Sequence, residues 1–313
     1  MKDHAFGVDL GGTTCKLGLF RTDGTLLEKW EIPTDRSENG SRILSDIAAA
    51  IRKKMDETGL TAERVRGIGI GVPGAVTPDG VVNRCINLGW GIVPVEEELS
   101  GLTGLPVRAA NDANIAALGE YWMGSGRGFD SIVMVTLGTG IGGGIILGGH
   151  IVAGHDGAGG EIGHIVVNPG ELEHCSCGNC GCIEQYASAT GIVRRAKHYL
   201  ASGTKASLLR GIEPLTARDV LEAAKQGDDL AGDVTEEVCT LLGRAIATIC
   251  NVVNPEAVLI GGGVSRAGQI LLDELRDGFD RSIFHAARNT KIVLASLGND
   301  AGIYGGVRLA LEE

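Results

Sequence analysis

The chain has 313 residues, of which 43% are hydrophobic and 21% charged, a composition typical of a globular protein large enough for two packed lobes. Its formal net charge of -11 argues against nucleic acid as the main ligand, because a phosphate backbone binds to a basic surface. The 50 glycines follow no G-X-Y period, which excludes a collagen-like chain.

The N-terminal third predicts strands separated by turns and followed by helices. MKDHAFGVDLGG contains no apolar segment with a cleavage site, so we expect no secretory signal and a cytoplasmic location. The predicted elements here are strands at 5–10, 16–20 and 25–32, a helix at 41–57, strands at 65–72 and 106–110, and a helix at 113–123.

The rest of the chain begins with an uncharged stretch, Ile132–Gly149, that hydropathy alone would assign to a membrane helix. Glycines crowd its centre, so we expect a hairpin over 132–151 instead. The predicted elements that follow are a Gly- and Cys-rich segment at 154–182, helices at 185–202, 216–226 and 230–254, a strand at 257–260, a helix at 265–279, a strand at 292–295 and a helix at 302–311.

One pattern occurs twice. VDLGGTT at Val8–Thr14 and VTLGTGI at Val135–Ile141 share Val-x-Leu-Gly followed by a Thr/Gly turn, each between two apolar strands. The repeat favours an α/β fold with two lobes of like topology and a cleft between them.

Three glycine-rich turns could hold a polyphosphate, because glycine lets backbone amides approach an anion closely. They are Gly11–Thr14 with Lys16 nearby, Gly138–Gly140, and Gly261–Gly263 between a strand and a helix. The alternative is that these glycines only form tight hairpins. Asp9 precedes the first turn and either caps it or orients Mg²⁺ through water.

A cluster of cysteines predicts a metal site. His164, Cys175, Cys177 and Cys182 would form a closed tetrahedral Zn²⁺ site, which is structural because it leaves no open position for a catalytic water. Cys180 and His174 are spare candidates, and ordinary reduced cysteines or a redox switch are the alternatives. If one ring nitrogen of His164 binds zinc, the other can bind a ligand in a fixed orientation.

The polar residues suited to a polyol are Asn111, Asp112, Glu161, His164 and Glu184. Asp112 lies where a strand ends and a helix begins, which is a suitable place for a general base. Spacing alone favours a helix cap for the Asn111-Asp112 pair. For Glu161, His164 and Glu184 a surface position is the alternative.

The sequence resembles the ROK family (repressors, open reading frames and kinases), and within it the bacterial glucokinases, over essentially the whole chain. The matching motifs are VDLGGTTCKLGLF at Val8–Phe20, GVPGAV at Gly71–Val76, NLGW at Asn87–Trp90, NDANIAALGE at Asn111–Glu120, TLGTGIGGGI at Thr136–Ile145, GAGGEIGH at Gly157–His164, CSCGNCGCIE at Cys175–Glu184, IGGGVS at Ile260–Ser265 and GNDAGIYGG at Gly298–Gly306.

The resemblance implies an actin-like, hexokinase-like two-domain ATPase fold (ribonuclease H-like) with an interdomain cleft. The small lobe would be residues 1–112 with 301–313, and the large lobe, with the zinc loop, would be 113–300. It also implies a homodimer or higher homo-oligomer. Cys180 departs from the family's zinc motif and is an extra cysteine.

The resemblance further implies phosphorylation of a hexose by ATP with Mg²⁺, most simply glucose at its 6-hydroxyl. Asp112 would be the catalytic base, which overrides the capping interpretation. The implied sugar ligands are Gly74, Asn87, Asn111, Asp112, Glu161, His164 and Glu184. The implied nucleotide and Mg²⁺ residues are Asp9, Gly11, Gly12, Thr13, Thr14, Lys16, Thr136, Gly138, Thr139, Gly140, Gly262 and Gly263. The implied zinc ligands are His164, Cys175, Cys177 and Cys182.

Two rival functions remain. One is a kinase for fructose, mannose or an N-acetylhexosamine. The other is a sugar-sensing regulator of the same family, which would carry an N-terminal DNA-binding domain; the first strand of this chain begins near its start and the net charge is acidic.

Overall fold

The structure is a computed structural model that describes residues 2–312, and it consists of two compact units. Unit 1 contains the chain up to Asp130, Gly144–Gly160 and the chain from Ser296 on, and unit 2 contains Ser131–Gly143 and Glu161–Ala295. The lobes expected from the resemblance, 1–112 with 301–313 and 113–300, remain a prediction. No helix within 2–312 is both long and apolar enough to span a bilayer.

Unit 1 is built on a five-stranded sheet of order β3-β2-β1-β4-β7. β1 pairs antiparallel with β2 and parallel with β4, which pairs parallel with β7. The strands are β1 (His4–Leu10), β2 (Thr14–Arg21), β3 (Leu26–Pro33), β4 (Val65–Val72) and β7 (Val107–Asn111). The helices of this unit are α1 (Ile43–Thr58), α2 (Val95–Thr103), α3 (Asp112–Met123) and α9 (Ala301–Ala310).

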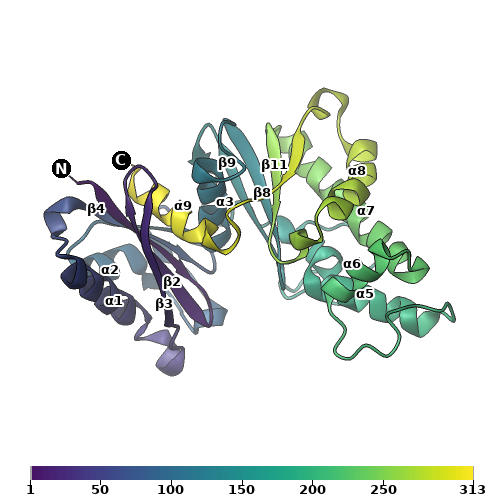
Figure 1. Ribbon diagram of the computed structural model, residues 1–313, viewed down its shortest axis with the longest axis horizontal. Helices are drawn as coiled ribbons and strands as arrows, with labels where there is room; N and C mark the ends of the chain where they lie inside the picture. Colours follow the sequence, from purple (N-terminus) through teal and green to yellow (C-terminus); the bar gives the residue numbers. More distant parts are fainter. Residues whose placement is uncertain (1, 313) are drawn as a thin grey trace. The chain divides into compact units, whose positions relative to one another are not determined.

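Alternation along β1 places different residues against the two layers of helices. Phe6 and Val8 join the core shared with α1 and α2, whereas Ala5 packs with Ile303 and Val307 of α9. Figure 1 shows the yellow α9 lying along the purple strands of this sheet.

α9 approaches its neighbours at backbone distance because both sides use glycine. A Cβ at Gly7 would overlap the carbonyl of Ile303, and a Cβ at Gly305 would overlap the carbonyl of Ile115 on α3. We call this contact of α9 with β1, β4 and α3 the glycine seam. It explains the GIYGG motif as packing.

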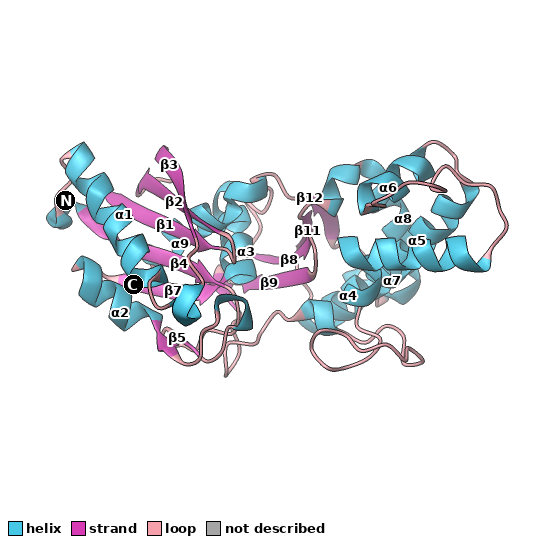
Figure 2. Cartoon of the chain, turned by 90° about the horizontal axis from the view of Figure 1, so that it is seen from below, coloured by secondary structure: helices cyan, strands magenta, loops and turns pink. Residues whose placement is uncertain are grey.

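The second sheet has the order β10-β9-β8-β11-β12. Its strands β8, β11 and β12 lie in unit 2, β10 lies in unit 1, and the division between the units falls within β9. The strands are β8 (Ser131–Leu137), β9 (Ile141–Leu147), β10 (His150–Ile151), β11 (Ala257–Gly261) and β12 (Lys291–Leu294). The helices are α4 (Glu184–Ala187), α5 (Ala189–Ser202), α6 (Ala217–Lys225), α7 (Asp229–Val253) and α8 (Gln269–Ser282), drawn in cyan beside the magenta strands in Figure 2.

Both sheets have the same arrangement: a strand, its two successors on one side, and two later strands on the other. β8 and β11 are parallel, as are β11 and β12. The prediction of two lobes with like topology, made from the repeated Val-x-Leu-Gly pattern, is confirmed.

Several predicted elements differ from the structure at their ends or interiors. The helix expected at 185–202 is interrupted at Ser188, which is extended (φ -72°, ψ 166°) and whose hydroxyl caps α5 by accepting from the amide of Gly191 at 3.0 Å. The helix expected at 265–279 is a 3-10 turn, Val264–Ala267, followed by α8, because Gly268 between them has φ 77°. Helix α2 and the short strands β5 (Val81–Val82) and β6 (Val93–Pro94) were not predicted.

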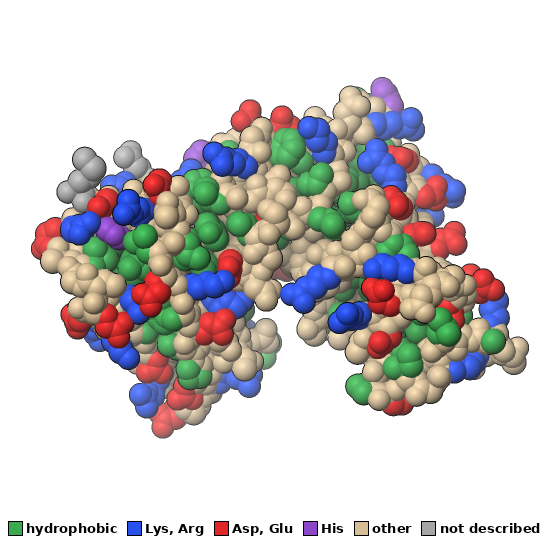
Figure 3. All heavy atoms as spheres, viewed as in Figure 1, with side chains coloured by type: hydrophobic (Ala, Val, Ile, Leu, Met, Phe, Trp, Pro, Cys, Tyr) green, Lys and Arg blue, Asp and Glu red, His purple; other side chains and the backbone are tan. Residues whose placement is uncertain are grey.

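On the face seen in Figure 3, basic and acidic side chains are interspersed, so this face presents no continuous basic track among the described residues.

Candidate active site and metal centre

The start of α3 presents the candidate base. β7 ends at Asn111 and α3 begins at Asp112. The Oδ1 atom of Asn111 accepts from the amides of Ala113 at 2.9 Å and Asn114 at 3.2 Å, so Asn111 is the N-cap. Asp112 is the first helical residue, half-buried, with Oδ1 2.8 Å from the amide of Ala113. The positive end of the helix dipole favours a carboxylate there.

A loop carrying Gly74 and Asn87 lies beside this helix start. The Nδ2 atom of Asn111 donates to the carbonyl of Gly74 at 3.1 Å. A Cβ at Gly74 would lie 3.7 Å from Cβ of Cys85, and Cys85 directly precedes the 3-10 turn, Ile86–Leu88, that carries Asn87. The structure thus joins Asn111 to Gly74 and places the turn of Asn87 next to the same loop, with Asp112 adjacent to Asn111 in the chain.

The first glycine turn joins β1 to β2. The amide of Gly11 donates to the carbonyl of Thr14 at 3.1 Å, and the hydroxyl of Thr34 donates to the carbonyl of Gly11 at 2.8 Å. A Cβ at Gly12 would lie 4.0 Å from the carbonyl oxygen of Asn87, so this turn neighbours the loop that carries Gly74 and Asn87.

Asp9 and Lys16 are cross-strand partners beside this turn. Their Oδ2 and Nζ atoms lie 3.7 Å apart, and Nζ also donates to the carbonyl of Asn299 at 3.2 Å. Burial raises the pKa of Asp9, and the charge of Lys16 opposes that rise. A half-buried carboxylate at the start of α9 is compatible with holding Mg²⁺ through water.

In unit 2, Glu184 supports the second glycine turn, which joins β8 to β9. Its Oε2 atom accepts from the amide of Ile141 at 2.9 Å, and its Oε1 atom accepts from the hydroxyl of Ser176 at 3.1 Å. The amide of Ala189 donates to the carbonyl of Gly138 at 2.8 Å. Glu184 therefore joins the second glycine turn to the segment of residues 171–182, which we call the cysteine loop.

A cavity of about 650 Å³ opens beside this turn. Gly138, Thr139 and Gly263 line it, so the second and third glycine turns border one space. Thr136 is the last residue but one of β8 and pairs with Gly261. The size and the mixture of apolar and polar walls suit a nucleotide.

Sequence reasoning did not find most of the residues that line this cavity. They come mainly from α6 with its cap and from the 3-10 turn after β11, and Ala189 comes from the start of α5. Val264 belongs to the matching motif IGGGVS, and Thr216, with Asp219 three positions later, is readable as a helix start. No motif distinguishes the others. The additional lining residues are Ala189, Thr216, Ala217, Arg218, Leu221, Glu222, Val264, Arg266 and Ala267.

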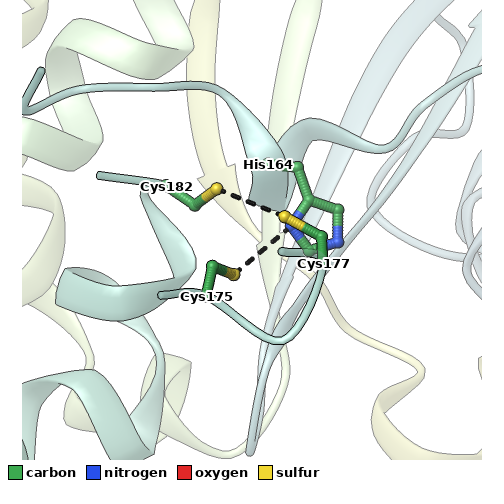
Figure 4. A group of neighbouring side chains, drawn as sticks. All are labelled: His164, Cys175, Cys177 and Cys182. Atoms are coloured by element: carbon green, nitrogen blue, oxygen red, sulfur yellow. Dashed lines mark hydrogen bonds between the residues drawn. The ribbon is translucent and has the colours of Figure 1, made fainter. Parts of the chain in front are cut away.

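The predicted zinc ligands come together in unit 2. One ligand atom from each of His164, Cys175, Cys177 and Cys182 lies within 4.8 Å of all the others. Cys177 Sγ and Cys182 Sγ are 3.6 Å apart, and Cys175 Sγ is 3.7 Å from His164 Nδ1 (Figure 4). Zn–S and Zn–N bonds of about 2.3 and 2.0 Å give tetrahedral edges of about 3.5–3.8 Å. The donor set fits Zn²⁺.

The two spare candidates lie apart from this cluster. Cys180 Sγ is 3.5 Å from His174 Nδ1, and His174 Nδ1 is also 3.1 Å from the carbonyl oxygen of Gly178. All eight cysteines are free thiols. The structure therefore selects one ligand set from the alternatives that the sequence left open.

His164 presents its two ring nitrogens to different partners. Nδ1 faces the sulfur of Cys175, whereas Nε2 lies 3.9 Å from Glu161 Oε2. Glu161 is 51% exposed and His164 29%. This is the arrangement expected of a histidine that binds a metal with one nitrogen and faces a ligand site with the other.

An ion-pair network pins the cysteine loop to α5. Arg194 pairs with Glu171 at 2.9 Å and also with Glu173. The hydroxyl of Tyr186 donates to Glu171 at 2.7 Å. The hydrogen bond from Tyr186, followed by that from Arg194, lowers the pKa of Glu171 from 4.5 to about 2. The loop therefore has an anchor besides the metal ligands.

The chain is similar to known proteins over nearly its whole length. The model of the ROK family matches residues 5–313. Glucokinases of Halalkalibacterium halodurans and Thermotoga maritima are each 42% identical to this chain, over 96% and 98% of it and over 92% and 96% of their own lengths. The crystal structure of a ROK family glucokinase from Streptomyces griseus in complex with glucose and AMPPNP is 35% identical, with a TM-score of 0.78 over 98% of both chains.

Proposed function

The chain belongs to the ROK family and has its actin-like ATPase fold, and from this premise we propose that it transfers the γ-phosphoryl group of ATP to the 6-hydroxyl of glucose. Relatives of this similarity are glucokinases, and one was solved with glucose and an ATP analogue. The structural observation that supports the proposal is the start of α3, where Asn111 supplies the cap and donates to the carbonyl of Gly74, and Asp112 is the first helical residue.

Asp112 is the general base of this proposal. It accepts the proton of the glucose 6-hydroxyl as that oxygen forms a bond to the γ-phosphorus. The bond from the γ-phosphorus to the bridging oxygen breaks, and ADP leaves with the electron pair. Gly74, Asn87 and Asn111 in unit 1, and Glu161, His164 and Glu184 in unit 2, are the proposed sugar ligands.

The nucleotide is assigned to the glycine turns and the cavity beside them. Gly138, Thr139 and Gly263 border a space of about 650 Å³, and backbone amides at such turns donate to phosphates. Thr13, Thr14 and Lys16 would reach the phosphates from the first turn. Asp9 would hold Mg²⁺ through water, and Mg²⁺ would neutralise phosphate charge.

Zinc has a structural part in the proposal. Bound by His164, Cys175, Cys177 and Cys182, it would fix the loop that carries Nε2 of His164 toward the sugar. The homodimer and the cytoplasmic location expected from the resemblance and the sequence stay predictions.

The decisive experiment measures ADP release by the purified protein with ATP, Mg²⁺ and a panel of glucose, mannose, fructose and N-acetylglucosamine. We expect the highest kcat/KM with glucose, with the product oxidised by glucose-6-phosphate dehydrogenase. Preference for another sugar would reassign the substrate. Tight glucose binding without turnover would favour a sensor, and turnover with polyphosphate but not ATP would reassign the donor.

A further inference from the structure

Glu120 is a buried carboxylate that the proposed reaction does not use directly. It lies on α3, the helix that begins with Asp112, and its relative exposure is 0%. A carboxylate in that environment is destabilising unless hydrogen bonds replace its hydration. The hydrogen-bond partners of Glu120 therefore indicate which part of the fold this carboxylate stabilises.

Both oxygens of Glu120 accept hydrogen bonds from chain segments at the ends of unit 1. Oε1 accepts from the amide of Leu297 at 2.6 Å, and Oε2 accepts from the amide and the hydroxyl of Ser296 at 3.1 and 3.3 Å. Oε2 also accepts from the amide of Ser125 at 2.9 Å. A Cβ at Gly124 would overlap Oε2, so this glycine makes room for the carboxylate.

The segments that carry Ser296 and Ser125 lie at or close to positions where the chain passes from one unit to the other. Ala295 is the last residue of unit 2 and Ser296 the first residue back in unit 1. The amide of Ala295 donates to the carbonyl of Ile260 on β11 at 2.9 Å, whereas the amide of Ser296 donates to Glu120. One peptide thus separates a residue bonded within unit 2 from a residue bonded within unit 1.

The crossing at 130–131 has the same character; the chain also changes unit at 143–144, within β9, and at 160–161. The carbonyl of Asp130 accepts from the amide of Gly149 in unit 1 at 3.3 Å, and the carbonyl of Ser131 accepts from the amide of Glu256 in unit 2 at 3.1 Å. Glu120 reaches the segment before this crossing through Ser125. Rotation between two bodies is absorbed by a few backbone torsions at such junctions.

We propose that Glu120 is a positioning residue for phosphoryl transfer, which fixes the unit 1 side of a hinge at the 295–296 peptide. Because Glu120 and Asp112 share one helix, the clamp sets where the base stands relative to that hinge. The inference rests on the proposed function for its kinetic consequence. Its structural part, that a buried carboxylate holds the Ser296 and Leu297 amides at the junction, does not.

The test uses the full-length protein with Glu120→Gln, in which an amide nitrogen replaces one acceptor. The expected kcat for glucose is about 10- to 100-fold lower, since a small misplacement of a catalytic group has that effect. AMPPNP affinity should stay within about twofold, because the hydrogen-bond partners of Glu120 are not among the residues assigned to the nucleotide, and the amides of Ser296 and Leu297 should exchange hydrogen faster. Ile47→Val, a buried substitution in α1 of the same unit, controls for general loss of stability.

Ser296→Ala provides a milder variant in case Glu120→Gln does not fold. It removes one donor, and kcat should fall about three- to tenfold. Unchanged kcat together with faster exchange at Ser296 and Leu297 would overturn the positioning role. A loss of activity that merely parallels the melting temperature, as in Ile47→Val, would make Glu120 structural only. Unprotected Ser296 and Leu297 amides in the wild type would overturn the clamp even if no kinase activity is found.

Discussion

Asn111 caps the helix that Asp112 begins. The side-chain oxygen of Asn111 accepts hydrogen bonds from the backbone amides of Ala113 and Asn114. The side-chain NH₂ group of Asn111 donates to the carbonyl of Gly74. Asn111 is therefore the N-cap of the pair, while Asp112, the first helical residue, also accepts from the amide of Ala113 through Oδ1 at 2.8 Å. A base at Asp112 is compatible with this arrangement, because the cap does not depend on the Asp112 carboxylate alone.

Replacing Asp112 with Asn tests that role. Asp112→Asn preserves side-chain size and the cap at Asn111, so we expect glucose binding to persist while kcat falls about 10²- to 10⁴-fold, the usual contribution of a general base. Steady-state kinetics and calorimetry measure the two. Asp79→Asn, at an exposed turn of the same unit, should leave both unchanged. A kcat of Asp112→Asn within tenfold of wild type would exclude the base.

Loss of zinc should disturb the segments that carry His164 and Cys175–Cys182. We expect one zinc per chain by elemental analysis, and we expect Cys177→Ser to lose it because the site has four ligands and no spare. The KM for glucose should rise, and the melting temperature should fall. Cys180→Ser is the matched control, since Cys180 faces His174, and it should retain the metal. A zinc-free Cys177→Ser protein with an unaltered KM for glucose would contradict the orienting role.

Glu184 and Glu161 should separate into two kinetic classes. Glu184→Ala removes an acceptor from the amide of Ile141 beside the second glycine turn, so the KM values for glucose and for ATP should both rise, by about 10-fold or more. Glu161→Ala, whose side chain lies near His164, should raise only the value for glucose. If both variants change the glucose KM alone, Glu184 does not support the turn.

Glu171 should make stability depend on pH. Its pKa is lowered in the folded protein, from 4.5 to about 2, so its stabilisation is complete above pH 4.5 and is lost as the pH falls toward 2. We expect Glu171→Gln to reduce the free energy of unfolding by about 1–3 kcal/mol at pH 7, with the deficit shrinking below pH 4.5. Glu173→Gln, 70% exposed, should show a small deficit. A deficit for Glu171→Gln that is constant with pH would refute the assignment.

Gly302 should tolerate no side chain. An added Cβ would stand 2.6 Å from Cγ of Asp9, so Gly302→Ala should displace that carboxylate and lower kcat together with the dependence on Mg²⁺. The control is Gly101→Ala in α2, where an added Cβ meets nothing within 4 Å; it should be neutral or stabilise by about 0.4–1 kcal/mol. Equal kinetics in the two variants would argue against a role for Asp9.

Elements with strong periodicity or clear boundaries could be predicted from the sequence. β4 begins and ends at the predicted residues because its apolar run stops at Pro73-Gly74. Helix α2 was missed because Pro94 and three consecutive glutamates resemble a charged loop, yet Val95 and Leu99 are buried. The break at Ser188 was missed because a serine cap inside an apolar pattern gives no periodic signal.

The candidate site could be predicted in part, for a similar reason. Cysteine density predicted a metal site but left Cys180 and His174 as alternative ligands. Spacing alone favoured a helix cap for Asp112, and its role as the base was implied by the resemblance. The cavity walls on α6 could not be found, because Ala217 and Leu221 are ordinary helix residues whose importance comes only from facing Gly138 and Gly263. The role of Glu120 could not be predicted either, because its partners Ser296 and Leu297 are distant in the sequence.

The glycine seam constrains the order of events during biosynthesis. β1 is synthesised first, but the helix that covers one face of its sheet is α9. The whole of unit 2 is translated between β1 and α9. Until α9 has been synthesised, the face of the sheet that carries Gly7 and Gly69 stays exposed to solvent. Unit 2 can therefore complete its folding before unit 1 does. A nascent chain halted before Ala301 should therefore carry an open, chaperone-dependent N-terminal half beside a finished partner.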